Sequence, residues 1–228
     1  MSEWAPFAIM RPGPTWKVGY SFRGESGPKR GDVKHSAEGD WPGLYAVLDG
    51  PAASSWHFTV GYDRVEQHYP VGDYCYHAGD VDGDGAVAAN IDLVGIEHLG
   101  SAGEPLTTYQ VEMTIQVSLW CAEQYGIARF ARYPEQEGVW TLVEHNQVSD
   151  MPTACPSGRI PWGEIIGRLT EEDAMTTEER AEFEALKARV TELEQYRDAV
   201  APMIDQGATA YTVLVAQRDL LDTALPGD

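Results

Sequence analysis

The sequence has few basic residues for a chain of its length. Its 228 residues include 16 Lys and Arg against 36 Asp and Glu, which gives a formal net charge of −20 at pH 7. Proteins that bind nucleic acid use Lys and Arg to neutralise phosphates, so this balance argues against a nucleic-acid partner. The acidity supports solubility instead, and it offers no long-range attraction to anionic polymers.

Long apolar runs are absent, and so is a secretory signal. No stretch approaches the roughly 20 apolar residues that a membrane-spanning helix needs, so we expect no membrane insertion. The first residues, MSEWAPFAIMRPGPTW, lack a basic segment followed by an apolar one, which is the pattern of a signal peptide. We therefore expect the protein to accumulate in the cytoplasm unless another route exports it.

Cysteine is scarce as well. The chain has three, Cys75, Cys121 and Cys155, and an odd number in a chain without a signal peptide indicates reduced thiols. Cys121 lies in an apolar helical pattern and is predicted to be a small buried residue. Cys155 lies among turn residues in PTACPSG, which is a different setting.

The composition changes near residue 170. Before it, short segments that are rich in Val and aromatic residues alternate with helical patterns and with Gly, Pro and Asp. These segments predict strands at 33–37, 56–62, 64–69, 94–99 and 140–145, and helices at 41–48 and 107–125. The alternation predicts an α/β domain over residues 1–170, with a mixed central β-sheet flanked by helices.

Residues 171–228 form an acidic tail with 14 acidic and 5 basic residues. Apolar residues in steps of three and four predict a coiled-coil-like helix, and a second amphipathic run covers 211–225. Pro202 and Gly207 separate the two runs. Two arrangements stay open for this helical tail: a hairpin that packs within its own chain, and a bundle that joins copies into a homo-oligomer.

Three residues are candidates for a metal site: His35, His145 and Cys155. The two histidines end predicted strands, and the cysteine follows in the next turn. Imidazole and thiolate suit zinc, and a catalytic zinc site uses three protein ligands, which strand ends can bring to one edge of a sheet. A single histidine beside a turn is more often structural, so the spacing alone leaves zinc undecided. His68 and His98, on strand-like runs, are interpreted as structural.

Five ordered segments resemble the type 2 N-acetylmuramoyl-L-alanine amidase family, which includes the peptidoglycan recognition proteins and many phage endolysins. Together they cover about residues 32 to 160, and their order carries the resemblance more than any single segment does. The segments are HSA at 35–37, SWHFTV at 55–60, YHAG at 76–79, VGIEHLG at 94–100 with Asn90 before it, and the segment from His145 to Cys155-Pro156.

The resemblance implies a zinc hydrolase that cleaves the amide bond between N-acetylmuramic acid and L-alanine in bacterial peptidoglycan. It implies that His35, His145 and Cys155 bind Zn²⁺ and that Glu97 is the catalytic base and acid. Many relatives carry Lys two positions before the last ligand, but this chain has Thr153. The Thr153 hydroxyl is therefore the candidate for stabilising the oxyanion, more weakly than an ammonium group would.

Trp56 stands where some endolysins carry Tyr, so the role of that hydroxyl cannot be carried over. Trp56, His57 and His77 are the candidates for substrate contact. The resemblance to endolysins also implies a phage protein that waits in the host cytoplasm until lysis and then cuts the cell wall. Two alternatives stay open, a non-catalytic peptidoglycan-binding module and a cytoplasmic wall-recycling amidase. Cys155 argues against the first, since non-catalytic members generally lack that ligand, and the acidic tail argues against the second.

Overall fold

The computed structural model describes residues 4–19, 28–78, 89–173 and 189. Contacts divide the chain into two units, Met1–Asp173 and Ala174–Asp228, and the account below concerns the first unit. The two helical runs predicted for the tail lie outside the described residues. Within the described part of the chain, no helix is both long enough and apolar enough to cross a bilayer.

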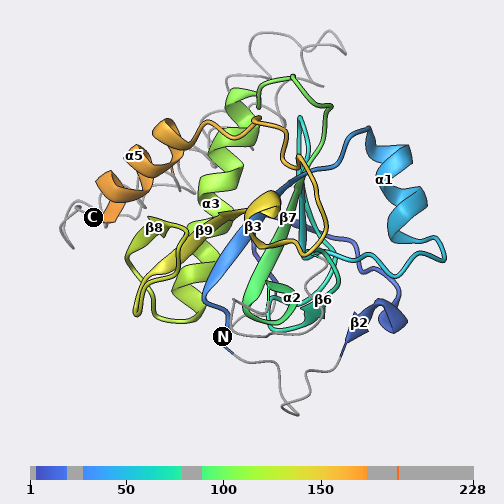
Figure 1. The fold of residues 1–228 in the computed structure, drawn as a ribbon, viewed down its shortest axis with the longest axis horizontal. Coiled ribbons are helices and arrows are strands. Elements are labelled where there is room, and N and C mark those ends of the chain that lie inside the picture. The colour runs from blue at the N-terminus through green and yellow to red at the C-terminus, as the bar shows by residue number, and fades with distance from the viewer. Residues whose placement is uncertain (1–3, 20–27, 79–88, 174–188, 190–228) are drawn as a thin grey trace, which may run out of the picture. The chain divides into compact units, whose positions relative to one another are not determined.

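A seven-stranded sheet forms the centre of this unit (Figure 1), in the order β1-β5-β4-β7-β3-β9-β8. The strands β4, β7, β3, β9 and β8 are parallel, whereas β5 is antiparallel to β4, and β1 is parallel to β5. The strands of this sheet are β1 (Ile9–Met10), β3 (Gly31–Ser36), β4 (Phe58–Val60), β5 (Val65–Gln67), β7 (Leu93–His98), β8 (Phe130–Arg132) and β9 (Trp140–Glu144).

Several shorter elements complete the unit. Strands β2 (Val18–Gly19) and β6 (Tyr74–Cys75) form a separate antiparallel pair, and a 3₁₀ helix covers Thr15–Lys17. The α-helices are α1 (Trp41–Leu48), α2 (Ala89–Asp92), α3 (Thr108–Gln124), α4 (His145–Val148) and α5 (Trp162–Asp173).

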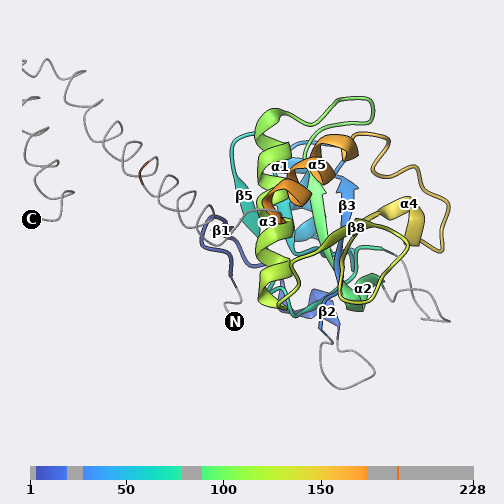
Figure 2. The same ribbon diagram turned by 90° about the vertical axis from the view of Figure 1, so that its left-hand side faces the viewer.

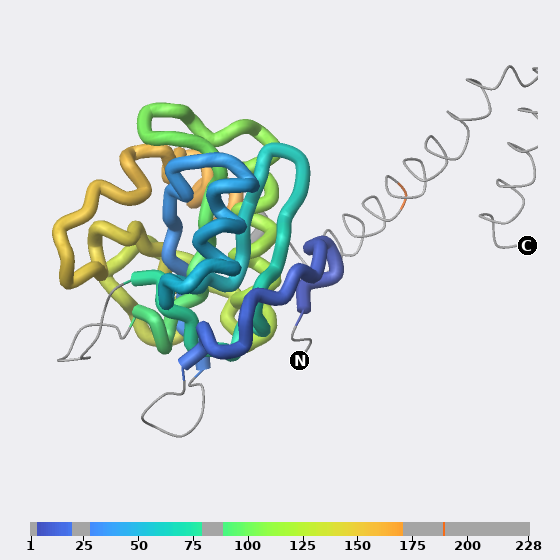
Figure 3. Tube along the Cα trace, turned by 90° about the vertical axis from the view of Figure 1, so that its right-hand side faces the viewer, coloured from blue at the N-terminus to red at the C-terminus, as the bar shows by residue number. Residues whose placement is uncertain are grey.

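Helices pack on both sides of the sheet. Helices α3 and α5 share a large apolar cluster with Phe58, Ile96 and Leu142 of the strands, and they lie on the viewer's side of the sheet in Figure 2. Helix α1 belongs to another cluster, with Trp56 and Leu99, and it faces the viewer in the opposite view of Figure 3. The central strands are thus enclosed, and every residue of β3 is buried.

The predicted helix ends have local causes. Helix α3 begins at a capping box, in which Thr107 and Gln110 each bond the other's backbone amide, and this pairing satisfies two helix-end donors. Gly126 follows the helix with φ +67°, a left-handed conformation that glycine adopts easily. Helix α1 begins at Asp40, whose carboxylate accepts from the amide of Gly43. The helices predicted at 41–48 and 107–125 are confirmed to within a residue.

The predicted α/β architecture is also confirmed. Each of the five predicted strands overlaps one of β3, β4, β5, β7 and β9. The sequence did not predict β1, β2, β6, β8, α2, α4 or α5, which are short or, like α5, adjoin the acidic tail. Helix α5 continues through residue 170 to Asp173.

Candidate metal centre

Parallel pairing brings three predicted site residues to one edge of the sheet. His35 is the penultimate residue of β3 and stands in register with Glu97 on β7. His145 directly follows β9, which pairs with the other side of β3. The carboxyl ends of these three strands therefore meet, and in open α/β sheets this is the edge where ligands bind.

The structure joins His35 and His145 to Cys155, which lies on the loop after α4. One ligand atom from each of the three residues lies within 4.8 Å of the others. The Sγ of Cys155 is 3.9 Å from Nδ1 of His35, and the two imidazole centroids are 4.5 Å apart. These residues therefore form a His/His/Cys group that could hold a metal ion.

The donor set and spacing fit zinc. Bonds of about 2.0–2.3 Å in a tetrahedral site leave nitrogen and sulfur ligands roughly 3.3–3.6 Å apart, so small shifts would complete such a site. Burial lowers the pKa of His35 and of His145, which keeps both rings neutral, with a lone pair to donate. Burial raises the pKa of the Cys155 thiol to about 12, and a nearby cation is what would favour the thiolate.

The loop that carries Cys155 is tied to the strand ends. The carbonyl of Cys155 accepts from the amide of Asn146, and its Sγ accepts from the amide of Ser36 at 3.2 Å. The amide of Cys155 donates to Oγ1 of Thr153 at 3.1 Å. The thiol position is thus fixed by backbone bonds to β3 and α4.

Arg159 reinforces this loop, and the sequence did not predict its role. Its buried guanidinium donates to Oγ of Ser36 and to the carbonyls of His98, Leu99 and Glu104, at 2.7–3.1 Å. An arginine that bonds three carbonyls links the loop to the ends of β3 and β7. Its partners lie 55 to 123 positions away, so no local pattern could have identified them.

Glu97 has a carboxylate oxygen without a hydrogen-bond partner among the described residues. This oxygen, Oε2, is buried. Burial, with a smaller contribution from Glu38, raises the pKa of Glu97 to about 8. Strongly shifted carboxyl groups beside a potential metal site are typical of catalytic acids and bases.

The three predicted substrate contacts occupy different settings. Trp56 is 4% exposed, and its indole N–H donates to Oγ1 of Thr59 at 2.8 Å. His57 is fully buried, accepts from the amide of Gly95, and bonds the carbonyl of Asp73. His77 lies beside His35, with 3.1 Å between Nδ1 of His77 and Nε2 of His35. Substrate contact by these three residues stays a prediction.

Four imidazoles consequently lie in a row along this edge. The row comprises His57, His77, His35 and His145, with neighbouring centroids 6.0, 5.2 and 4.5 Å apart. Burial also lowers the pKa of His77, to about 3. The row is therefore neutral, and its members interact through hydrogen bonds and ring contacts.

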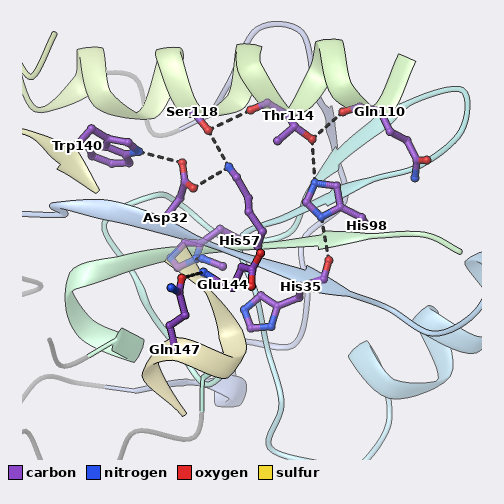
Figure 4. Close-up of polar contacts among 12 residues, drawn as sticks. Asp32, His35, His57, His98, Gln110, Thr114, Ser118, Trp140, Glu144 and Gln147 are labelled. Carbon is purple, nitrogen blue, oxygen red and sulfur yellow. Dashed lines mark hydrogen bonds and ion pairs between the residues drawn. The ribbon is translucent and has the colours of Figure 1, made fainter. Parts of the chain in front are cut away.

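The opposite face of the same strands carries a buried polar network (Figure 4). Lys34 forms an ion pair with Asp32 at 2.6 Å and donates to Ser118 at 2.7 Å, and Asp32 accepts from the Trp140 indole at 2.9 Å. All four side chains are buried. We call these residues, together with His98, Gln110 and Thr114, the back network.

His98 connects the back network to the metal centre. Its Nδ1 lies 2.8 Å from the carbonyl oxygen of His35, and its Nε2 lies 2.8 Å from Oγ1 of Thr114 on α3. Gln110, Thr114 and Ser118 recur every fourth residue and form a buried polar stripe on the helix. That stripe is a signal in the sequence for this network, but the helix was predicted from its helical pattern alone.

Comparison with known proteins identifies the fold. No protein-family model matches the chain, and no curated protein matches it. A solved structure of an AmpD derivative matches with a TM-score of 0.56 and 17% identity, covering 74% of this chain and 98% of that one. The Staphylococcus aureus hydrolase AmiA with its ligand matches with a TM-score of 0.53 and 15% identity, over 75% and 84%.

A third match is the endolysin N-acetylmuramoyl-L-alanine amidase LysCS from Clostridium intestinale. Its TM-score is 0.51 with 19% identity, over 74% of this chain and 99% of that one. The resemblance predicted from the sequence segments is thus confirmed at the level of the fold. The chain has the fold of endolysin-like N-acetylmuramoyl-L-alanine amidases.

Proposed function

We propose that this protein is a zinc-dependent N-acetylmuramoyl-L-alanine amidase that cuts bacterial peptidoglycan. One observation carries the proposal: a His/His/Cys group shares a sheet edge with the open carboxylate of Glu97. That combination of a ligand set and an adjacent acid or base supports metal-assisted hydrolysis. The fold shared with amidases supports the amide bond between N-acetylmuramic acid and L-alanine as the substrate bond.

In this proposal His35, His145 and Cys155 hold one Zn²⁺. A bound zinc ion lowers the pKa of water toward 7 and polarises a substrate carbonyl. The protein contributes neutral imidazoles, a thiol held by the amide of Ser36, and a loop fixed by Arg159. These features orient the ligands.

Glu97 moves the proton. When ionised, its carboxylate accepts a proton from the attacking water, whose oxygen bonds to the lactyl carbonyl carbon. The C–N bond then breaks, and Glu97 returns the proton to the departing amine of L-alanine. A cation at the neighbouring ligand group favours the ionised carboxylate and opposes the effect of burial on its pKa.

Thr153 is the proposed donor to the oxyanion. Its oxygen already accepts from the amide of Cys155, which leaves the hydroxyl hydrogen available, since a hydroxyl can accept and donate at once. A neutral donor stabilises a developing negative charge less than an ammonium does.

We further propose that the protein serves as a phage endolysin, held in the host cytoplasm until lysis gives it access to the wall. The support for this role is the set of sequence segments shared with endolysins and the likeness in fold to an endolysin. For the acidic tail, most of which lies outside the described residues, both notions stay proposals: a helical hairpin within one chain, or a segment that joins copies into a homo-oligomer.

Digestion of purified peptidoglycan tests the activity. Products are assayed for new L-alanine amino termini and for new reducing sugars, with a zinc chelator and again after zinc is restored. We expect amino termini that disappear with the chelator and return with zinc, and no reducing sugars. A folded, zinc-loaded protein that releases neither product would contradict the amidase and favour a binding module.

A further inference from the structure

The ring of His35 uses its two nitrogens for different purposes. Its Nδ1 faces Cys155 within the ligand group, at 3.9 Å from the sulfur. Its Nε2 points away from that group and lies 3.1 Å from Nδ1 of His77. A neutral imidazole has one N–H and one lone pair, so Nδ1 can bind a metal only if the proton sits on Nε2.

A backbone carbonyl decides where that proton sits. Nε2 of His77 lies 3.3 Å from the carbonyl oxygen of Leu93, and a carbonyl oxygen only accepts. His77 therefore carries its proton on Nε2, and its Nδ1 is left with a lone pair. That lone pair requires the facing nitrogen of His35 to be the donor.

We propose that His77 is a positioning residue, which accepts a hydrogen bond from Nε2–H of His35 and so directs the lone pair of His35 Nδ1 toward the metal site. The relay runs from the Leu93 carbonyl through His77 to His35. Its significance for zinc rests on the proposed function, whereas the tautomer of His35 is a property of the metal-free protein. Partners of this kind fix the ring orientation and raise the basicity of metal-binding histidines.

Two neighbours hold His77 in place for this task. A Cβ atom on Gly95 would stand 2.6 Å from Cγ of His77, so the imidazole packs on β7 where only glycine leaves room. Oδ1 of Asn90 accepts from the backbone amides of His77 and Ala78, both at 2.8 Å. Asn90, Gly95 and His77 all lie in the segments that carry the family resemblance, and these contacts show that Asn90 and Gly95 both position the His77 ring.

The same contacts bear on substrate binding. Both ring nitrogens of His77 are already bonded within the protein. A substrate group could use either nitrogen only by displacing His35 or the Leu93 carbonyl. The arrangement therefore favours positioning over the substrate contact predicted from the sequence.

The first test uses the unaltered protein without metal. In protein with ¹⁵N-labelled histidine, proton–nitrogen correlation spectra distinguish protonated from unprotonated ring nitrogens, and the His35 signals are those lost in His35→Gln. We expect His35 and His77 each to carry a proton on Nε2. A proton on Nδ1 of His35 would overturn the proposal, whether or not the protein proves to be an amidase.

The second test compares two variants of similar size. Asn places its Oδ1 where His77 carries Nδ1, so His77→Asn keeps an acceptor for His35, whereas His77→Leu removes it. By competition with a chromogenic chelator we expect zinc to bind about 10- to 100-fold more weakly to His77→Leu, and His77→Asn to stay close to the unaltered protein. Gly95→Ala, which pushes the ring of His77, should weaken zinc binding with every ligand still present.

Each result has a separate meaning. Equal zinc affinity in His77→Leu and the unaltered protein would overturn the positioning role. An equal loss in His77→Asn and His77→Leu would also overturn it, since packing rather than the acceptor would then matter. Failure of the unaltered protein to bind zinc, or to cut peptidoglycan when loaded, would contradict the proposed function instead and leave the His35 tautomer to be judged by its spectrum.

Discussion

The two faces of strand β3 use polar side chains in opposite ways. Toward α3, Asp32 and Lys34 are buried but paired with each other, with Ser118 and with Trp140. Toward the candidate metal centre, His35 and Cys155 have donor atoms close together that can bind a metal, and Oε2 of Glu97 has no hydrogen-bond partner among the described residues. The back network therefore stabilises the packing of the strands against α3, whereas the opposite face leaves donor atoms and a carboxylate oxygen able to bind other groups.

The largest expected effect is a loss of activity when Glu97, on the metal-centre side of the sheet, is replaced. Glu97→Gln should lower kcat by about 10²- to 10⁴-fold, because the amide can neither accept nor return a proton. Zinc affinity and the free energy of unfolding should stay close to those of the unaltered protein, since the carboxylate oxygen has no partner to lose. Turnover of a soluble muropeptide, with zinc content measured alongside, checks this. Activity within tenfold of the unaltered enzyme would remove Glu97 from the mechanism.

The next largest effect is a loss of stability when the ion pair of the back network is broken. Lys34→Met leaves Asp32 charged and buried, and removal of one partner from a buried ion pair costs about 3–5 kcal/mol of unfolding free energy. Urea denaturation of the metal-free protein measures the loss. The double variant Asp32→Asn/Lys34→Met is the control, because it removes both charges and should recover part of the stability. A single variant as stable as the unaltered protein would contradict the stabilising role.

A pH series sharpens the comparison further. Burial lowers the pKa of His98 to about 3 and that of His68 to about 4, below the ordinary 6.5 of an unfolded chain. As the pH falls from 6.5 toward 4, these histidines become protonated in the unfolded chain but stay neutral in the folded protein. The free energy of unfolding that they contribute above pH 6.5 is therefore progressively lost. Each histidine contributes at most about 1.4 kcal/mol per pH unit.

The variant His98→Gln tests that slope within the back network. Glutamine does not titrate. The slope of unfolding free energy against pH between pH 6.5 and 5 should therefore decrease by up to about 1.4 kcal/mol per pH unit, which is the contribution of one proton. Urea titrations at three pH values in this range give the slope directly. An unchanged slope would mean that His98 takes up protons equally in the folded and the unfolded protein, which would contradict the lowered pKa.

The smallest effect concerns Trp56. Trp56→Phe removes the hydrogen bond to Thr59 and should cost about 1 kcal/mol of stability. Because the indole is 4% exposed, we expect KM for a soluble muropeptide to be unchanged. A higher KM with unchanged kcat would restore the substrate contact predicted from the sequence.

The sequence predicted the parts of this site that depend on local pattern. The strands that end near His35, Glu97 and His145 were located from segments rich in Val and aromatic residues, and α3 from its helical pattern. Lys34 could not be placed, because its partner Ser118 lies 84 positions away, and a lysine in a strand is ordinarily solvent-exposed. Arg159 and the relay through His77 depend on tertiary contacts in the same way. His68 and His98 were interpreted as structural, and both are buried with both ring nitrogens bonded.

The pairing of β3 with β9 also determines when the ligand group can exist. Gly31 stands opposite Thr141, about 110 positions later in the chain, and closing so long a loop costs entropy before its contacts repay it. During synthesis His35 leaves the ribosome first, and His145 and Cys155 follow only about 110 residues later. Under the proposed function, all three ligands can therefore hold an ion only after the sheet has assembled, so the ion would not guide the early steps of folding.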